Sequence, residues 1–268
     1  MSKAFEDQVV IVTGASEGIG RALALALARQ RARLSLAARS AERLAGLARE
    51  CEALGAEALA VPCDVTDEAQ CRRLVAATVD RFGGLDMLVA NAGRTMWANF
   101  EDLDEFGVLQ TLMAVNYLGA ACCTHAALPH LRQRQGRIVA VASVAGLTGV
   151  PARSGYCASK HAMIGFFDAL RIELAGSGVS VSVIAPDFVT TEMHRRALGP
   201  DGRPLGRSPM REERIMTAER CAELILRAAA ARRRLLITSL RGRVGRWLRL
   251  IWPGAVDRIA RRAIEQRY

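Results

Sequence analysis

An unbroken apolar and β-branched run, QVVIVT at residues 8–13, leads directly into a glycine-rich stretch, TGASEGIG at residues 13–20. A strongly apolar segment typical of a helix, RALALALARQ, follows at residues 21–30. An apolar run without alternation predicts a strand that is buried on both faces. Such strands belong to parallel sheets that helices cover on both sides. The start of the chain therefore predicts a strand–turn–helix unit of an α/β fold.

The same alternation continues along the chain. Further strands are predicted at 32–38, 56–65, 85–93, 136–143, 179–187 and about 234–239, and helices at 40–54, 66–82, within 102–133 and at 155–175. Strands that alternate with helices form right-handed βαβ units. We predict one Rossmann-like doubly wound parallel sheet of about seven strands over residues 1–239. Residues 240–268 form a basic helical C-terminal extension of the same domain.

Composition limits the classes of partner. Lys and Arg number 37 against 27 Asp and Glu, which gives a formal net charge of +10. Much of this excess is a group of arginines near the end of the chain: Arg232, Arg233, Arg234, Arg241, Arg243, Arg246, Arg249, Arg258, Arg261, Arg262 and Arg267. A basic tail therefore explains the charge, and no recognised module with interleaved aromatic and basic residues indicates nucleic acid.

The seven cysteines show no CxxC pair and no Cys/His spacing for a metal, so we expect no metal site. Their odd number and the absence of an apolar signal segment favour reduced thiols and a cytoplasmic protein. No apolar run reaches the roughly 18 to 20 residues that span a bilayer. Cys157 lies beside a tyrosine, but no oriented base accompanies it, so we interpret it as a space-filling side chain.

The glycine-rich stretch has the features of a phosphate-binding turn. Gly14 permits a tight turn, and Gly18 and Gly20 allow close approach of backbone to phosphate and of helix to sheet. The N-terminus of the following helix offers unpaired N–H groups to a pyrophosphate. Because the turn lies between a strand and a helix, the pattern predicts a dinucleotide site.

The spacing TGxxxGxG resembles the cofactor turn of the short-chain dehydrogenase/reductase family. Three more features agree: NAG at residues 91–93 after the fourth strand, Asn116 in the next helix, and Ser143 thirteen residues before Tyr156 of YCASK. The resemblance covers roughly residues 8–193 and is nearest to the hydroxysteroid-dehydrogenase-like, membrane-associated branch. It implies that the cofactor contacts Gly14, Ser16, Gly18, Ile19, Gly20, Arg39, Ser40, Asp64, Val65, Asn91, Ala92, Gly93, Tyr156, Lys160, Pro186, Val189 and Thr191.

The second strand indicates which nucleotide is bound. Ala38 stands where NAD-using members of the family carry Asp, so no carboxylate repels a 2′-phosphate. Arg39 follows with a planar fork suited to phosphate oxygens, and Ser40 adds a hydroxyl. We predict NADP(H). Glu17 departs from the basic residue that many NADP users have at that place, and a solvated surface charge is the alternative for Arg39.

Tyr156 and Lys160 are four residues apart, so on a helix they share one face at about 6 Å. A phenol titrates near 10, and a nearby ammonium lowers that pKa toward the range of general acid–base catalysis. An ordinary exposed helix face would show the same pair. The resemblance adds that Tyr156 exchanges the proton, Ser143 binds the substrate oxygen and Lys160 holds the nicotinamide ribose. It also implies that Asn116 positions a water, although an amide that satisfies helix backbone is the alternative.

The remaining segments bear on the substrate. APDFVTTEM at 185–193 resembles the family's nicotinamide-side loop, with Asp187 in place of its glycine. Residues 194–216 hold Gly, Pro and charges and predict a lid or a disordered loop. Residues 145–155, Met96, Trp97 and Met193 are mainly apolar and indicate a hydrophobic carbonyl or alcohol, steroid-, retinoid- or acyl-like, although core packing draws on the same residues.

The tail has an apolar stripe at helical spacing between arginines: Leu240, Val244, Trp247, Leu248, Ile251 and Trp252. Such a helix can lie in a membrane interface. A helix packed on the domain and an oligomer contact are the alternatives. We therefore predict an NADP(H)-dependent carbonyl reductase that is cytoplasmic, with peripheral membrane contact through 240–268 as one hypothesis. The resemblance implies a homodimer or homotetramer. A dinucleotide-binding sensor without turnover, or a membrane-peripheral scaffold, is the alternative function.

Overall fold

In the part of the chain that the structure describes, seven strands pair in parallel throughout, in the order β3-β2-β1-β4-β5-β6-β7. The computed structural model describes residues 4–208 and 215–265. The strands are β1 (Val9–Thr13), β2 (Arg33–Ala38), β3 (Glu57–Pro62), β4 (Met87–Ala90), β5 (Arg137–Val141), β6 (Ser180–Ala185) and β7 (Leu235–Ile237). The order reverses direction at β1 and β4, so the predicted doubly wound sheet is confirmed. Ligands of such sheets bind where the order reverses, beyond the carboxyl ends of the strands.

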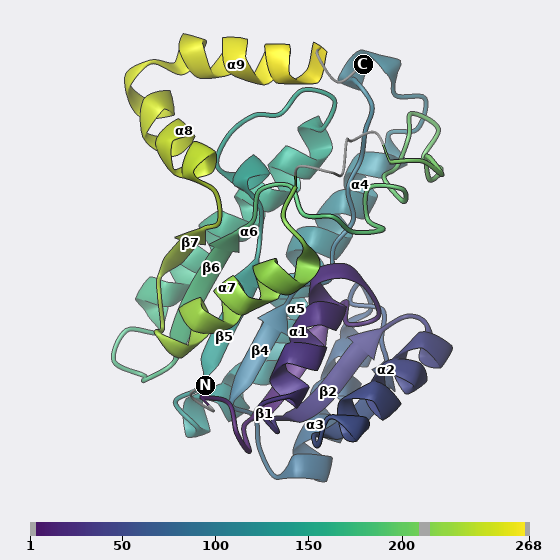
Figure 1. The fold of residues 1–268 in the computed structure, drawn as a ribbon, viewed down its shortest axis with the longest axis vertical. Helices are drawn as coiled ribbons and strands as arrows, with labels where there is room; N and C mark the ends of the chain where they lie inside the picture. The colour runs from purple at the N-terminus through teal and green to yellow at the C-terminus, as the bar shows by residue number, and fades with distance from the viewer. Residues whose placement is uncertain (1–3, 209–214, 266–268) are drawn as a thin grey trace.

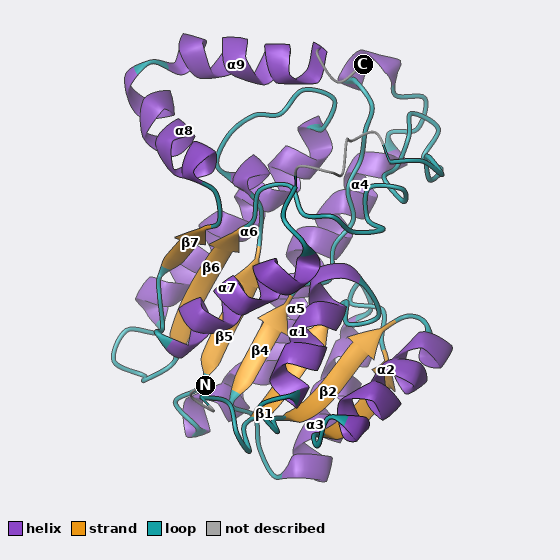
Figure 2. Ribbon diagram, viewed as in Figure 1, coloured by secondary structure: helices purple, strands orange, loops and turns teal. Residues whose placement is uncertain are grey.

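Helices cover both faces of the sheet (Figure 1, Figure 2). They are α1 (Gly18–Ala28), α2 (Ala41–Ala53), α3 (Glu68–Phe82), α4 (Gly107–Met113), α5 (Gly119–Gln133), α6 (Ser154–Glu173), α7 (Ala218–Ala230), α8 (Leu240–Ile251) and α9 (Pro253–Glu265). In β1, Val10 and Val12 join the core under α1, α2 and α7, whereas Val9 and Ile11 join the core under α3, α5 and α6. Successive side chains of a strand point to opposite faces, which is why this strand is apolar at every position.

Side chains cap the starts of α2 and α3. The hydroxyl of Ser40 accepts a hydrogen bond from the backbone N–H of Arg43 at the start of α2. The Asp67 carboxylate accepts the backbone N–H of Gln70 at 3.1 Å at the start of α3. Asp64, predicted as a cofactor contact, accepts the backbone N–H and the hydroxyl of Thr66.

The helix expected within 102–133 is continuous only from Gly107, and one turn of it, η2 (Ala114–Leu118), is a π-helix between α4 and α5. Residues 100–102 form a separate 3-10 turn, η1 (Phe100–Asp102). By length and composition alone, Gly107–Gln133 is apolar enough to cross a membrane. Ala120, Cys123, Ala127 and Leu131 of α5 lie in the core of the sheet, which is the expected place for an apolar core helix.

The segment predicted as a lid or disordered loop is, over 194–208, held against the protein by irregular structure. The backbone N–H of Leu198 donates to the carbonyl of Thr95, and that of Trp97 donates to the carbonyl of Leu198, both at 2.9 Å. Ala197 and Leu198 are buried. This part of the segment is therefore packed and not a free lid, and residues 209–214 lie outside the described residues.

The C-terminal extension consists of α8 and α9, which stand above the carboxyl edge of the sheet (Figure 1). Ser239 caps α8 through the backbone N–H of Gly242. Arg249 of α8 donates to the backbone carbonyl of Leu147 at 2.7 Å. The extension thereby reaches the loop after β5, where the predicted catalytic serine lies.

Candidate active site

The glycine turn after β1 is built as its sequence predicts. Gly14 and Gly18 have φ values of +63° and +53°, in the left-handed region that favours glycine. A Cβ at Gly20 would lie 2.2 Å from the carbonyl oxygen of Gly14, so this position also requires glycine. The side-chain amide of Asn91 donates to the carbonyls of Thr13 and Gly14. Asn91, predicted as a cofactor contact, therefore also fixes the shape of the turn.

A cavity of about 830 Å³ opens at the carboxyl ends of the strands. Its walls include most of the predicted cofactor and catalytic residues: Gly14, Ser16, Gly18, Ile19, Arg39, Ser40, Asp64, Val65, Asn91, Ala92, Gly93, Ser143, Tyr156, Lys160, Pro186, Val189 and Thr191. Gly20 and Asn116 do not line it. Gly20 packs against the turn, and Asn116 is fully buried.

One end of the cavity carries three arginines. Arg39 and Arg43 line it together with Arg94. Burial lowers the pKa of Arg94, and the positive charge of Arg39 lowers it further, so the two guanidinium groups lie close enough to repel. Glu17, the residue that departs from the pattern of NADP users, pairs with Arg43 at 3.2 Å and with Arg196 at 2.6 Å. Its charge is thereby compensated, and this end of the cavity fits a phosphate.

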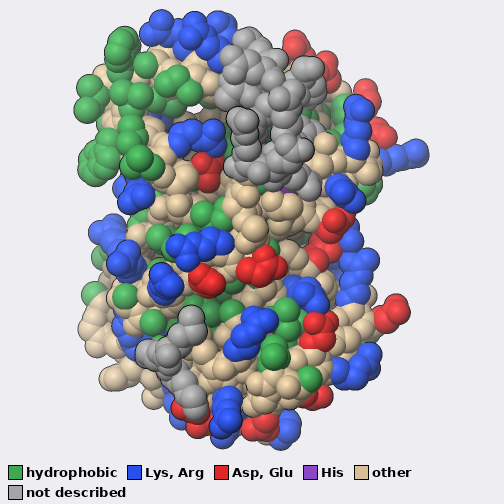
Figure 3. Space-filling model, viewed as in Figure 1, with side chains coloured by type: hydrophobic (Ala, Val, Ile, Leu, Met, Phe, Trp, Pro, Cys, Tyr) green, Lys and Arg blue, Asp and Glu red, His purple; other side chains and the backbone are tan. Residues whose placement is uncertain are grey.

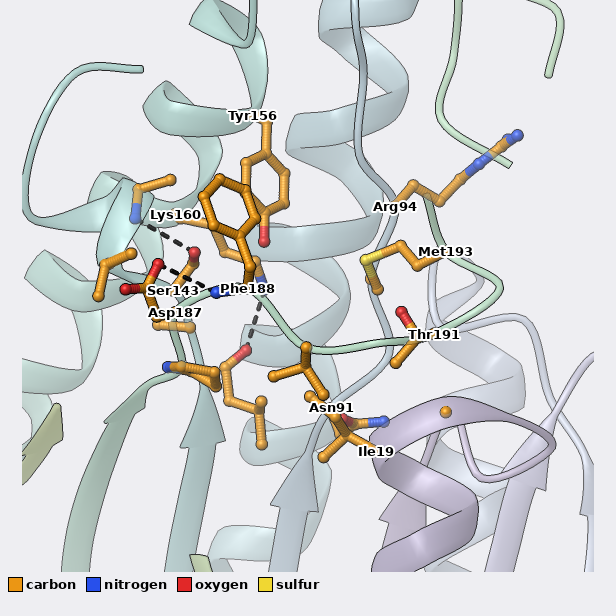
Figure 4. Close-up of a pocket in the computed structure, with 18 of the residues that line it drawn as sticks. Ile19, Asn91, Arg94, Ser143, Tyr156, Lys160, Asp187, Phe188, Thr191 and Met193 are labelled. Carbon is orange, nitrogen blue, oxygen red and sulfur yellow. Dashed lines mark hydrogen bonds between the residues drawn. The ribbon is translucent and has the colours of Figure 1, made fainter. Parts of the chain in front are cut away.

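Ser143, Tyr156 and Lys160 meet at the other end (Figure 4). Ser143 follows β5 in extended conformation, and its hydroxyl accepts the backbone N–H of Ala145. Tyr156 and Lys160 lie in the first turns of α6 and are 6% and 3% exposed. The Lys160 ammonium donates to the carbonyl of Val141 at 3.0 Å. Burial lowers the pKa of Lys160 to about 8.

The pKa of Tyr156 is raised in this structure, so the predicted direction is wrong here. Burial raises it most, and the charge of Arg153 and a hydrogen bond with Ser143 lower it only in part. The Lys160 ammonium lies 5.9 Å from the Tyr156 ring centroid and is directed to the backbone carbonyl at the end of β5. The cost of burying the phenolate therefore outweighs the stabilisation that the prediction expected from a lysine on the same helix face.

Asn116 lies in the π-turn η2, and all of its side chain is used in hydrogen bonds. Its carbonyl accepts the backbone N–H of Arg94 at 2.8 Å, and its amide donates to the carbonyl of Arg94 and to the hydroxyl of Ser159. Asn116 thus joins the loop after β4 to α6. This arrangement matches the alternative that its amide satisfies backbone groups, in this case of a loop, and the expected water remains a prediction.

Asp187, where the family pattern has glycine, has a definite role. Its carboxylate accepts hydrogen bonds from the Ser239 hydroxyl at 2.7 Å and from Arg241 at 2.8 and 3.0 Å. Its backbone N–H donates to the hydroxyl of Thr238. The loop after β6 is therefore anchored to the start of α8, and the position does not require the left-handed conformation of glycine.

Several sequence expectations about the cavity need correction. Met96 and Trp97 do not line it: both are buried in apolar clusters behind the wall. Met193 does line it. Burial raises the pKa of the Cys157 thiol, which favours the space-filling interpretation over a nucleophile. Val244 and Leu248 of α8 and Val256 and Ile259 of α9 line the cavity too, so the extension forms part of its wall.

Three cations that line the cavity were not identified from the sequence: Arg43, Arg94 and Arg153. Arg94 directly follows NAG, and that position was its signal. Arg43 follows Arg39 by four residues, and this repeat across the start of α2 was an available signal. Arg153 is only 4% exposed, and its guanidinium lies 4.5 Å from the centroid of the Tyr156 ring. The signal was a single arginine in the otherwise uncharged stretch AGLTGVPARSGY, three residues before the tyrosine.

Comparison with known proteins agrees with this geometry. A family model described as short chain dehydrogenase matches residues 8–199. The chain is 44% identical over 189 residues to 11-beta-hydroxysteroid dehydrogenase-like 4A of Arabidopsis thaliana, which covers 70% of this chain and 63% of that protein. It is 37% identical over 237 residues to 11-beta-hydroxysteroid dehydrogenase-like 6 of the same plant, covering 86% of this chain and 69% of that protein.

Among solved structures, a short chain dehydrogenase/reductase from Burkholderia phymatum in complex with NAD superposes with a TM-score of 0.81 at 29% identity. The match covers 92% of this chain and 94% of that one. Levodione reductase superposes with a TM-score of 0.79 at 27% identity, over 88% of this chain and 98% of that one. The match to the 4A relative spans less than two thirds of that relative's length.

Proposed function

This chain belongs to the short-chain dehydrogenase family, and from that membership we propose an NADP(H)-dependent oxidoreductase that interconverts a carbonyl and a secondary alcohol. The observation that carries the proposal is one cavity that brings the glycine turn together with Ser143, Tyr156 and Lys160. A solvated surface pair would not be 6% and 3% exposed at the carboxyl edge of the sheet.

The glycine turn and the N-terminus of α1 would hold the pyrophosphate, and Arg39, Arg43 and Arg94 would hold the 2′-phosphate. A bound reduced nicotinamide supplies the hydride. Tyr156 protonates the substrate oxygen during reduction, and Ser143 donates a hydrogen bond to the same oxygen. Lys160 holds positive charge near the phenol and would hold the nicotinamide ribose. Because burial raises the pKa of Tyr156, the phenol is protonated at neutral pH and is suited to reduction.

The proposed substrate is hydrophobic. Leu147, Val150, Phe188 and Met193 line the cavity near Tyr156, and residues of α8 and α9 continue this apolar wall. A steroid-, retinoid- or acyl-like carbonyl compound fits walls of this kind.

The proposal is tested by the decrease in NADPH absorbance with a panel of hydrophobic ketones and aldehydes. Tyr156→Phe should reduce turnover to background while NADPH binding, measured by calorimetry, survives. Full turnover by this variant would contradict the catalytic role of Tyr156. A protein that binds NADPH but reduces no member of the panel would favour the alternative of a sensor without turnover.

NADP(H) preference has its own test. Arg39→Asp should weaken NADPH binding more than NADH binding, since the carboxylate repels the 2′-phosphate and accepts ribose hydroxyls. Arg49→Asp, an equal change of charge on the exposed surface of α2, is the control. An unchanged ratio of the two affinities in Arg39→Asp would refute the NADP(H) assignment.

We also propose that α8 and α9 contact an anionic membrane surface. Figure 3 shows hydrophobic side chains gathered over this corner of the molecule, beside blue Lys and Arg side chains. Trp247, Leu250, Ile251 and Trp252 are 60–83% exposed. Exposed Trp and Ile beside arginines are typical of helices that lie in a lipid interface. The opposite side of the helices lines the cavity, so a hydrophobic substrate could enter from the lipid.

Flotation with vesicles of anionic lipid tests this contact. Ile251→Glu should weaken flotation, and Phe100→Glu, at a residue 62% exposed outside α8 and α9, should not. If both variants float like the wild type, the membrane proposal fails. The family resemblance makes a homodimer or homotetramer the expected assembly. Dissociation of that assembly by Ile251→Glu, measured by light scattering, would assign the apolar surface to an oligomer contact instead.

A further inference from the structure

Arg153 is the most deeply buried arginine that lines the cavity. It precedes α6, lines the same cavity as Tyr156 and is 4% exposed. Its guanidinium carbon lies 4.5 Å from the centroid of the Tyr156 ring, 5.6 Å from that of Trp97 and 5.9 Å from that of Phe188. Three aromatic rings therefore surround this cation beside the reacting phenol.

Within residues 4–208 and 215–265, no carboxylate pairs with Arg153. Its Nη2 donates a hydrogen bond to the hydroxyl of Thr95 at 2.6 Å, and its buried Nε has no acceptor. Arg171, which is also largely buried, pairs with Asp168 at 2.6 Å. Cation–π contacts attract a guanidinium but provide no carboxylate or carbonyl acceptor, so they leave the buried Nε–H without a hydrogen bond and replace only part of the lost hydration. A buried, charged and incompletely bonded group of this kind points to a missing anionic partner.

The missing partner belongs to the cavity. Arginine binds carboxylates through two parallel N–H···O bonds, and such pairs are stronger where water is excluded. The other arginines of the cavity differ: Arg241 pairs with Asp187, Arg196 pairs with Glu17, and Arg39, Arg43 and Arg94 are the group proposed for the 2′-phosphate. Arg246 also lines the cavity but is exposed on α8. Arg153 is thus the deeply buried arginine available to a substrate whose carbonyl lies at Tyr156.

We propose that Arg153 forms an anion subsite and that the substrate is an oxo acid, in which an apolar body carries a carboxylate a few bonds from the carbonyl. This inference rests on the proposed function, because it places the carbonyl at Tyr156. The short distance from the guanidinium to the Tyr156 ring requires the carboxylate and the carbonyl to be close neighbours in the substrate. The apolar wall formed by Leu147, Val150 and Met193 holds the rest of the molecule.

A charge at Arg153 also acts on the proton of Tyr156, and the experiment must separate that effect from substrate binding. Both members of an acid–ester pair use the same phenol, so an effect on Tyr156 changes the kcat/KM of both equally. The intrinsic reactivities of the acid and the ester are the same with every variant, so the change of the acid-to-ester ratio from wild type to variant reports the contact with the carboxylate.

The experiment measures NADPH-dependent reduction of benzoylformate and its methyl ester, and of levulinate and its methyl ester. Arg153→Met should lower the acid-to-ester ratio of kcat/KM for at least one pair by about 10- to 100-fold relative to wild type, the effect of losing a charge-assisted contact. Arg153→Lys should restore part of that ratio. Arg246→Met is the matched control, since Arg246 also lines the cavity but is exposed on α8.

Binding supplies a second measurement that needs no turnover. Benzoate should bind the wild-type protein more tightly than methyl benzoate by calorimetry, and Arg153→Met should abolish the difference. If Arg153→Met does not fold, wild-type protein that binds benzoate no more tightly than methyl benzoate still overturns the subsite. Loss of the acid preference in Arg246→Met but not in Arg153→Met overturns it as well.

The two proposals fail in different ways. If neutral ketones are reduced without any preference for acids, the reaction stands and the anion subsite is wrong. If benzoate binds in an Arg153-dependent way but no carbonyl compound is reduced, the subsite stands and the reaction is wrong.

Discussion

Lys160→Met should make the protein more stable and inactive. Lys160 is buried, and desolvation alone lowers its pKa from 10.5 to about 8, which costs the folded state about 3 kcal/mol at pH 7. Methionine has a similar length and needs no water. The variant loses the hydrogen bond to the carbonyl of Val141, which offsets about 1 to 2 kcal/mol, so the net gain is about 1 to 2 kcal/mol.

The pH dependence is the sharper measurement. The folded pKa of Lys160 lies below its unfolded value, so between them the unfolded state binds more protons, and stability rises with pH. Relative to Lys160→Met, the wild type should gain about 2 kcal/mol between pH 7 and pH 9.5. Urea unfolding at both pH values measures this difference, with Arg49→Met as the control that follows the wild type. A difference that does not change with pH would refute a buried, charged Lys160 with a lowered pKa.

Two further predictions concern the turn and the extension. Gly20→Ala should abolish binding of NADPH in calorimetry, because the new Cβ would clash with the Gly14 carbonyl. Gly46→Ala in α2 is the control: its Cβ would meet nothing within 4 Å, so binding should be preserved and the free energy of unfolding should rise by up to about 1 kcal/mol. Asp187→Ala should speed hydrogen exchange across α8 several-fold, since Arg241 and Ser239 lose their acceptor, and unchanged exchange would show that α8 is held by other contacts.

Much of the fold follows from local sequence. A strand that is buried on both faces is mostly apolar, and this pattern predicted β1 and the strands that follow it from the sequence. The glycine turn was predictable for a similar reason: left-handed φ at Gly14 and close contact at Gly20 leave few other residues possible. These constraints act within one strand–turn–helix unit, so a stretch of consecutive residues is enough to predict them.

The features that the sequence did not predict depend on contacts between segments that are far apart in the chain. Asp187 was recognised only as a departure from a pattern, because its partners Ser239 and Arg241 come more than fifty residues later. The π-turn at Asn116 depends on hydrogen bonds with Arg94 and Ser159 from two other elements. Helical spacing correctly placed Tyr156 and Lys160 on one face but could not give the burial that decides the direction of the Tyr156 pKa shift.

The two buried cations of the site support one view of its chemistry. Lys160 and Arg153 both lie near the Tyr156 ring and neither has a carboxylate partner among the described residues, so each lowers the stability of the folded protein. A structural role alone would be filled better by apolar side chains of the same volume. Two such charges beside one phenol are therefore best explained by anions that arrive with the ligands and by the negative charge that develops on the substrate oxygen. On this view the dinucleotide and an oxo acid both stabilise the protein when they bind, and they do so through different cations.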